Sequence, residues 1–404
     1  MRLRYSQGVL ADSLTTSHGS AARQHTLRER NLELVARAVF DSPDPLSRAD
    51  VAASTGLARA TVSTLVDRLV AGGLLSELAP VSAQRAGRPA VPLIPAARSV
   101  VGIGLEVNVG YLGASVMDLT GDIVDERVVP GAFHDSNPAV VLPRVGALAR
   151  ELVEACLADG MRVAGARLAL PGLVDSRAGL LQVAPNLGWS SVQPIPLLDL
   201  DDLHVEVANE AKLAGLAELI GDVASSFLYV SADVGIGAAV VVDRRLFLGE
   251  RGWNGEIGHV VVDPAGPRCG CGALGCLEQY AGKEAVMRAA GLSPDAPLET
   301  LVHALHARSA SAEAAVRRAA LALGSALADF VNLVDVCTIV LGGAYTTLLP
   351  WLHEPVAGVL ADRVLSAPFA PVEVRGAVAG PYAAMAGGAH EVLRDVLAAP
   401  ADWV

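Results

Sequence analysis

Three of the chain's five cysteines fall within eight residues, in the stretch RCGCGALGCLE at residues 268–278. Cys269 and Cys271 are separated by one residue, which places them poorly for a disulfide with each other. Cys276 follows after four intervening residues, and the glycines between the cysteines allow the backbone to turn around a small ion. With His259, the stretch supplies three thiolates and one imidazole, a set typical of zinc. Buried, unpaired cysteines are the alternative interpretation.

Four protein ligands would leave no coordination position open for water, so the pattern predicts one structural Zn²⁺ per chain and no catalytic metal. The other two cysteines, Cys156 and Cys337, lie in apolar surroundings and are interpreted as core residues. Five cysteines in 404 residues do not form a disulfide scaffold, which favours a reducing cytoplasm.

The composition predicts a folded cytoplasmic protein of two or three domains. The chain has 404 residues, of which 52% are hydrophobic and 18% charged, as in packed globular domains. No run of about 18 uncharged apolar residues indicates a membrane span, and the first residues lack the apolar core of a secretory signal.

The charge differs strongly between the two ends of the chain. The net charge is −12, yet residues 1–95 contain 11 Arg, no Lys and 8 acidic residues, which gives +3. The remaining residues hold 20 basic and 35 acidic groups, which gives −15. Only the first part therefore has a net charge that suits binding to nucleic acid.

The first part has the pattern of a helix-turn-helix. Residues 1–25 are polar without periodicity, and we expect them to be flexible. Thr26 and Ser47 each begin a capping box, which predicts two helix starts, and Gly56 predicts a turn before a third helix at 59–70. The polar residues of that third helix suit contacts with a major groove. The predicted DNA-contacting residues on it are Arg59, Thr61, Ser63 and Thr64. A plain three-helix bundle is the alternative.

A loop after the third helix resembles the wing of a winged helix. Short strands are predicted at 74–75 and 91–94, and the loop between them carries Arg85 and Arg88 without an acidic residue. Gly87 and Pro89 flank Arg88, and such a sequence can place a guanidinium in a narrow minor groove. We predict that Arg85 and Arg88 bind DNA. A solvated linker loop is the alternative.

From residue 99 onward, strands and helices alternate, which predicts an α/β fold with two halves. Three strands are expected between 99 and 129. Further strands are expected at 166–172, 205–209, 226–232, 238–242 and 337–343. Helices are expected at 142–158, 211–220, 283–291, 297–307 and 312–334.

Seven motifs together resemble the ROK family of repressors, open reading frames and sugar kinases, in its regulator branch. They are GRP at 87–89, LPGLVD at 170–175, APNLGW at 184–189, ANEAKLAGLAE at 208–218, GEIGH at 255–259, CGCGALGCLE at 269–278 and VLGG at 340–343. The resemblance implies a winged helix-turn-helix followed by a two-lobed, actin/hexokinase-like (ribonuclease H-like) domain with a sugar cleft. The domains expected are 1–25 (flexible), 26–95 (DNA-binding), 96–225 (first lobe) and 226–404 (second lobe with the zinc motif).

The resemblance also implies sugar-contacting residues. His259 matches the family histidine that links the metal to a sugar hydroxyl, and Glu256 and Glu278 match carboxylates that contact the sugar. On spacing alone, Glu256 would be interpreted as a surface or capping residue. The full predicted sugar set is Asn186, Asn209, Glu210, Glu256, His259 and Glu278. Lys212 follows in the same motif, but we interpret it as a helix-surface lysine without a role.

Two departures from the kinase pattern favour a regulator. Family kinases have an aspartate base where this chain has Glu210, which is longer by one methylene. The kinase phosphate loop Asp-x-Gly-Gly-Thr is replaced by LEVNV at residues 105–109, where Glu106 would repel a phosphate. We therefore predict no efficient enzyme activity.

The chain is predicted to be a DNA-binding transcriptional regulator, with repression as the favoured role. It would bind double-stranded operator DNA as a homodimer or higher homo-oligomer. A sugar or sugar-phosphate effector would control it. An ATP-dependent hexose kinase with an accessory DNA-binding domain is the alternative. A third hypothesis treats the helical N-terminal part as a protein-interaction module.

Overall fold

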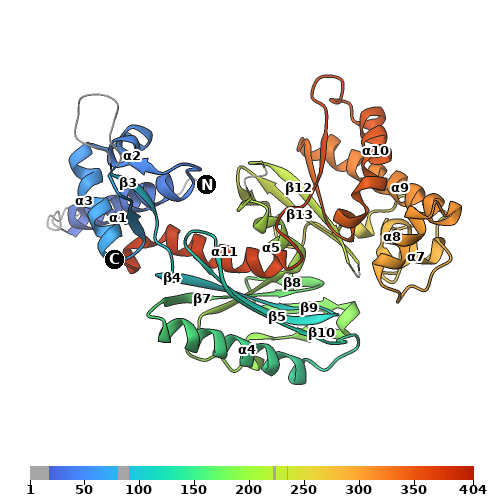
Figure 1. Ribbon diagram of the computed structural model, residues 1–404, viewed down its shortest axis with the longest axis horizontal. Helices are drawn as coiled ribbons and strands as arrows, with labels where there is room; N and C mark the ends of the chain where they lie inside the picture. The colour runs from blue at the N-terminus through green and yellow to red at the C-terminus, as the bar shows by residue number, and fades with distance from the viewer. Residues whose placement is uncertain (1–17, 81–90, 222–223, 234) are drawn as a thin grey trace, which may run out of the picture. The chain divides into compact units, whose positions relative to one another are not determined.

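The computed structural model describes residues 18–80, 91–221, 224–233 and 235–404. The chain divides into two compact units, which are described separately (Figure 1). The first comprises Met1–Ala96 with Asp395–Val404, and the second comprises Ala97–Arg394. The predicted wing residues Arg85 and Arg88 lie outside the described residues.

The N-terminal segment of the first unit, over its described residues 18–80 and 91–96, folds into three helices and a small sheet with strand order β1-β3-β2. Its elements are α1 (His18–Phe40), β1 (Leu46–Ser47), α2 (Arg48–Thr55), α3 (Arg59–Ala71), β2 (Leu75–Glu77) and β3 (Pro92–Pro95). The two predicted strands are present within one or two residues. The pairing of β1 with β3 was not predicted, because a two-residue strand has no period of its own.

The capping prediction holds for α2 but not for α1. Ser47 accepts a hydrogen bond from the backbone of Asp50, whose carboxylate accepts one from the Ser47 N–H, and Gly56 ends the helix at a φ of 73°. By contrast, α1 begins at His18, so Thr26 lies inside the helix and the predicted start there is wrong. The four residues Ala21, Ala22, Arg23 and Gln24 before Thr26 are good helix formers, which favours a helix there without apolar periodicity.

The C-terminal end of the chain is part of the first unit. The short helix η4 (Pro400–Asp402) contacts α1. Val404 lies against Gly72 at the end of α3, where a Cβ atom in place of the glycine hydrogen would collide with the valine side chain. No local sequence pattern indicates this association.

The second unit contains two five-stranded sheets with the same topology. In each sheet the first three strands form an antiparallel meander, and the fourth and fifth strands run parallel to the first. The first sheet has the order β11-β7-β4-β5-β6 and the second β14-β13-β12-β15-β16. Their strands are β4 (Val100–Val107), β5 (Tyr111–Asp118), β6 (Ile123–Pro130), β7 (Arg162–Leu170), β11 (Val205–Asn209), β12 (Phe227–Ala232), β13 (Ile236–Val242), β14 (Arg245–Leu246), β15 (Thr338–Gly343) and β16 (Glu373–Gly376).

Helices cover both faces of each sheet (Figure 1). The first sheet has α4 (Pro138–Ala158) on one face and α11 (Ala383–Ala398) on the other. The second sheet has α5 (Glu210–Ala217) on one face and α9 (Ala310–Val334) and α10 (Ala344–Arg363) on the other. The remaining elements are β8 (Leu173–Asp175), β9 (Leu180–Ala184), η1 (Pro185–Leu187), β10 (Trp189–Val192), η2 (Ile195–Leu197), η3 (Ile257–His259), α6 (Glu278–Ala281), α7 (Lys283–Ala289) and α8 (Leu298–His306).

The strand β4 shows how the sequence sets the two faces of the first sheet. Ile103 and Leu105 belong to the core that also contains α4. The alternate positions are glycines, and at Gly104 a Cβ would collide with the carbonyl oxygen of Met385 in α11. Because side chains alternate along a strand, Glu106 lies on the α11 face rather than in the apolar core. These layers confirm the predicted α/β class, and among the described residues no helix combines the length and hydrophobicity needed to cross a bilayer.

Candidate functional site

The second unit contains a cavity of about 750 Å³ to which all six predicted sugar residues contribute. A cavity of this size is in the range of small-molecule sites. The contributing residues are Asn186, Asn209, Glu210, Glu256, His259 and Glu278. They come from four separate stretches of sequence, so the fold brings together what only the family resemblance had grouped.

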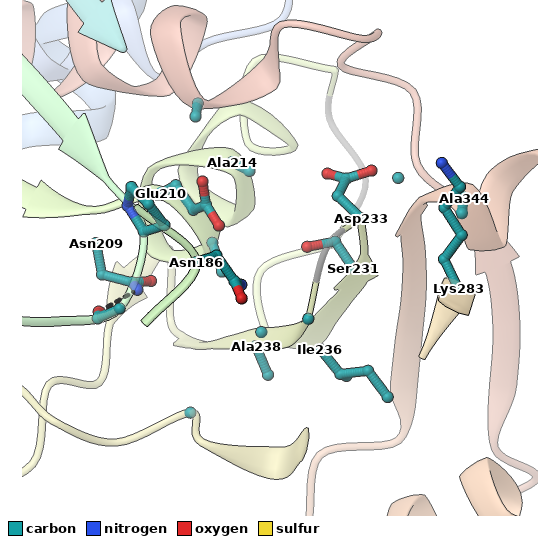
Figure 2. A pocket seen from close by; sticks show the side chains of 18 of the residues that line it. Asn186, Asn209, Glu210, Ala214, Ser231, Asp233, Ile236, Ala238, Lys283 and Ala344 are labelled. Carbon is teal, nitrogen blue, oxygen red and sulfur yellow. Dashed lines mark hydrogen bonds between the residues drawn. The ribbon is translucent and has the colours of Figure 1, made fainter. Parts of the chain in front are cut away.

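The turn that carries Asn186 is anchored by a buried tryptophan three residues later. It lies in η1, between β9 and β10, and Trp189 is almost fully buried. The Trp189 indole N–H donates to the backbone oxygen of Ser136 at 2.8 Å, which anchors the turn. Figure 2 shows the Asn186 amide and the Glu210 carboxylate beside the same space.

Asn209 has a structural role as well as a place in the cavity wall. Its side-chain oxygen caps α5 by accepting from the Lys212 N–H at 3.2 Å, and its Nδ2 donates to the Gly172 oxygen at 2.9 Å (Figure 2). Only one N–H of the amide remains for a ligand. Glu210, the first residue of α5, has a pKa raised well above its usual value by burial and by the nearby carboxylates of Glu106 and Asp233.

The interpretation of Lys212 as a surface residue is wrong. Its relative exposure is 6%, and its ammonium group donates to the backbone oxygen of Gly252. Burial lowers the pKa of Lys212, although the charge of Glu256 opposes that shift. Every neighbour of Lys212 in α5 is buried as well, so this short helix has no solvent face for the lysine to occupy.

Two glycines help to position the carboxylates of Glu256 and Glu278. A Cβ at Gly255, whose φ is 93°, would collide with the Ala238 oxygen, so the glycine lets the chain approach β13 just before Glu256. A Cβ at Gly235 would lie 2.9 Å from the Glu278 carboxylate. Partial burial raises the pKa of Glu256, while the neighbouring His259 and Lys212 lower it.

Backbone pairing brings His259 to the cysteines. The Leu277 N–H donates to the Val260 oxygen at 2.8 Å, and Val261 pairs with Cys276 in an isolated bridge. A tight turn, in which the Cys269 N–H donates to the Ala273 oxygen, holds the other two cysteines. The distant histidine and the cysteine cluster therefore form one centre.

The ligand atoms of this centre have the spacing that a tetrahedral ion requires. Zinc–sulfur bonds of about 2.3 Å imply sulfur–sulfur separations of about 3.8 Å around a tetrahedron. The sulfurs of Cys271 and Cys276 are 3.6 Å apart, and the Cys269 sulfur is 3.8 Å from His259 Nδ1. The four ligand atoms all lie within 4.8 Å of one another. The arrangement can hold a metal ion, and it leaves the other ring nitrogen of His259 available.

The electrostatics of the three thiols also favour a cation. Burial and the adjacent thiols raise the pKa of Cys276 to about 12, because thiolates this close to one another repel. The backbone N–H of Ala273 instead lowers the pKa of Cys271 by hydrogen bonding to its sulfur. A divalent ion would remove the repulsion and stabilise all three thiolates.

The cavity also contains titratable residues that were not predicted as site residues. Glu106 is 3% exposed, and burial raises its pKa to about 7 although Tyr111 and Asn108 hydrogen-bond to it. Among the described residues, its Oε2 atom has no hydrogen-bond partner. Its position before a hairpin was visible in the sequence, but its burial depends on the glycines of β4 that admit α11.

Asp233 occupies the corresponding hairpin of the second sheet. It directly follows β12, and its carboxylate accepts a hydrogen bond from the backbone N–H of Ala344, the first residue of α10. Figure 2 shows Lys283 reaching toward the start of α10, near Asp233. Burial raises the pKa of Asp233, and the charge of Lys283 and the Ala344 N–H oppose this shift. The equal topology of the two sheets thus places a carboxylate at each first hairpin.

In the first unit, the predicted DNA-contacting residues lie on one helix. Arg59, Thr61 and Thr64 are exposed on α3, while Ser63 is half-buried. The buried face of this helix consists of Val62, Leu65, Val66 and Leu69, as predicted. The hydroxyl of Thr64 donates to the Ala60 oxygen at 3.1 Å, so that hydroxyl is already used within the helix.

Comparison with known proteins gives a family match. The sequence profile of the ROK family matches residues 102–394. The xylose repressor of Bacillus subtilis is 23% identical over 350 residues, which span 85% of this chain and 90% of the repressor.

Two solved structures show similar folds. A ROK family transcriptional regulator, described as a homologue of the Escherichia coli Mlc protein, has a TM-score of 0.77 and 25% identity, with 92% of this chain and 97% of that chain covered. A ROK hexokinase from Thermus thermophilus has a TM-score of 0.60 and 27% identity, with 75% of this chain and 98% of that chain covered. The kinase structure therefore leaves a quarter of this chain without a counterpart.

Proposed function

The chain belongs to the ROK family, and we propose that it is a sequence-specific DNA-binding regulator, a repressor of sugar metabolism, that works in the cytoplasm. One observation carries the proposal: a helical unit with an exposed polar recognition helix is joined to a sugar-sized, carboxylate-rich cavity. The resemblance inferred from the motifs is confirmed. We retain the predicted lobes at 96–225 and 226–404, since one five-stranded sheet falls in each range.

The cavity supplies the sensing function. Carboxylates and amides that line one side of a cavity suit the vicinal hydroxyls of a sugar, and Asn186, Glu256 and Glu278 provide such groups. His259, Cys269, Cys271 and Cys276 would hold one structural Zn²⁺. When bound, the ion fixes these side chains and supplies no reaction centre, because no coordination position remains open. His259 would offer its second ring nitrogen to a sugar hydroxyl.

The first unit supplies the DNA-binding function. Arg59 lies in the first turn of α3, where a recognition helix contacts base edges. Arg85 and Arg88 would contact the minor groove. Because DNA binding by a single module with a charge of about +3 is weak at physiological salt, we propose that the chain acts as a homodimer on paired half-sites.

The helix α11 connects the two functions. It begins at Ala383, which lines the cavity, and its last residues from Asp395 onward belong to the first unit. At Gly387 the helix lies directly against α5, since a Cβ there would collide with the Leu213 oxygen. Glu218, fully buried just after α5, accepts from the backbone N–H groups of Val378 and Ala379. We propose that a sugar bound at the start of α5 acts on the DNA-binding unit through this helix.

The second candidate function is an ATP-dependent hexose kinase. Glu210 favours it, because a buried carboxylate with a raised pKa at the kinase-base position could accept a proton from a hydroxyl. Glu106 and Asp233 oppose it, since they occupy the two hairpins that would have to approach the phosphates of ATP. Steady release of ADP from ATP and a panel of hexoses at enzyme-like rates would establish the kinase. We expect no turnover above background.

An arginine substitution tests the proposed DNA interface. We expect Arg59→Ala to weaken binding to the protein's own operator by about 1–3 kcal/mol if Arg59 contacts a base, or to lower the salt dependence by about one ion if it contacts a phosphate. Arg30→Ala, at an exposed arginine of α1, is the matched control and should bind as the wild type does. Binding is measured by fluorescence anisotropy over a range of salt concentrations.

Two outcomes would separate the remaining hypotheses. Equal affinities of the wild type, Arg59→Ala and a folded Arg88→Ala protein would contradict the assigned DNA surface. The protein-interaction hypothesis would be supported instead by two results together. The protein would select no fragment of genomic DNA, and it would capture a protein partner through residues of α3. Circular dichroism establishes that each variant is folded.

A further inference from the structure

The charges around the cavity are unequal. Five carboxylates contribute to its lining, whereas Lys283 is the single lysine and no arginine takes part among the described residues. The carboxylates are Glu106, Glu210, Asp233, Glu256 and Glu278. Phosphate groups in proteins are bound mainly by arginine and lysine and by free backbone N–H groups. A wall of this composition suits hydroxyl groups, which can donate to a carboxylate.

One element of the cavity could bind an anion, but a side chain of the protein already occupies it. The helix α10 is 20 residues long and begins at Ala344, and no side chain caps it from Gly343. Its first N–H group instead donates to the Asp233 carboxylate, which lies 2.8 Å from where a Cβ of Gly343 would be. Lys283 faces the same carboxylate. Asp233 therefore stands where a ligand phosphate would gain most from the helix dipole.

The opposite hairpin is closed in a similar way. Glu106 is buried there, and the Tyr111 hydroxyl hydrogen-bonds to it. The Tyr111 ring packs edge-on against Tyr382, with ring centroids 5.3 Å apart, immediately before α11. A phosphate at this position would meet a buried carboxylate to which the Tyr111 hydroxyl already donates.

We infer that the effector of this regulator is an uncharged sugar and that the cavity excludes the phosphorylated form of the same sugar. The inference rests on the proposed sensing function and names the chemical class of its ligand. A phosphate dianion would have to displace Asp233 from α10 or lie beside the carboxylates. Each carboxylate that stays ionised opposite the phosphate weakens binding on the order of tenfold. Neutral hydroxyls carry no such penalty and can pair with either form of a carboxyl group.

Calorimetric titration with matched ligand pairs tests the inference. The probes are xylose, glucose and N-acetylglucosamine, together with glucose 6-phosphate and N-acetylglucosamine 6-phosphate, added to the full-length zinc-loaded protein. We expect at least one neutral sugar to bind and its phosphate, where tested, to bind at least about tenfold more weakly. A phosphorylated sugar that binds as tightly as its parent sugar, or more tightly, would overturn the inference and leave the proposed sensing function intact. Absence of binding by every probe would contradict the sensing function itself.

A charge-neutral variant makes the test specific to the occupied helix end. Asp233→Asn keeps an acceptor for the Ala344 N–H but removes the charge. The gap in affinity between each neutral sugar and its phosphate should therefore narrow about tenfold. Asp201→Asn, at an exposed turn, is the matched control and should leave the gap unchanged. An unchanged gap in a folded Asp233→Asn protein, with the same result for Glu106→Gln, would refute the assigned cause of exclusion.

Discussion

The buried carboxylate of Glu106 makes a quantitative prediction about stability. Its pKa is about 7 in the folded chain, against 4.5 for an ordinary glutamate, because burial disfavours the charged form. Between pH 4.5 and pH 7, Glu106 in the folded chain therefore retains a proton that it has already lost in the unfolded chain. Stability is highest when Glu106 is protonated and is lost as the pH rises through the folded pKa.

The size of this effect follows from the two pKa values. Because each unit of pKa difference corresponds to about 1.4 kcal/mol, ionisation of Glu106 costs about 1 kcal/mol at pH 5.5 and about 3 kcal/mol at pH 8. Glu106→Gln cannot ionise, yet its side-chain oxygen can still accept from the Tyr111 hydroxyl. Relative to Glu106→Gln, the wild type should lose about 2 kcal/mol of unfolding free energy between pH 5.5 and pH 8.

The assay is urea denaturation of both proteins at several pH values, with the difference between them as the readout. Effects of pH on the metal centre and on groups that do not interact with Glu106 cancel in that difference. Glu151→Gln, at an exposed position of α4, is the control and should follow the wild type at every pH. Parallel pH profiles of the wild type and Glu106→Gln would refute the electrostatic account of this side of the cavity.

Three further predictions concern contacts that stabilise each unit internally. Gly387→Ala should destabilise the chain by about 1–3 kcal/mol and weaken the sugar response, because its Cβ collides with the oxygen of Leu213. Gly358→Ala in α10 is the control: its Cβ meets open space, so this variant should be neutral or stabilising in thermal unfolding. Cys276→Ser should reduce the zinc content from about one ion per chain toward none and lower the melting temperature, as measured by metal analysis and calorimetry; unchanged zinc content would disprove the ligand set. Ser47→Ala should cost about 1 kcal/mol by removing the α2 cap, and an unchanged denaturation midpoint would contradict this.

Local signals predicted the first unit well because its helix boundaries are encoded within a few residues. The capping box at Ser47 and the turn at Gly56 need no distant partner, and the apolar face of α3 follows from its own spacing. The start of α1 was missed because helix propensity continued the helix beyond the capping pattern at Thr26. The C-terminal contact of Val404 depends on chain ends far apart in sequence, so no local pattern could indicate it.

Two long helices of the second unit were missed because each contains residues of low helix propensity. The helix α10 contains Pro350 and Pro355, which normally argue against a helix interior. The helix α11 contains the pair Gly387 and Gly388, which normally lowers helix propensity. In the fold, the Gly387 position is the one where α5 approaches the helix backbone most closely, so the residue that hides the helix from a sequence pattern is required by its packing.

The candidate site divides in the same way. The four residues of the candidate metal centre were predicted because the three cysteines are close in sequence and match the chemistry of one ion, and the structure brings His259 to them. Asp233 was not predicted as a site residue, because its role depends on the first N–H of α10, more than 100 residues away. The burial of Lys212 could not be inferred either, since it depends on α5 being covered on all sides.

A sugar bound in the cavity of the second unit should change DNA binding by the first unit. Fluorescence anisotropy with an operator duplex selected from the protein's own genome, measured with and without a sugar that calorimetry shows to bind, tests this claim directly. We expect the dissociation constant for DNA to change at least about tenfold in the wild type, a coupling of about 1.4 kcal/mol, and to stay constant in a folded Glu278→Gln protein that no longer binds the sugar. An identical dissociation constant with saturating sugar bound to the wild type would contradict the account.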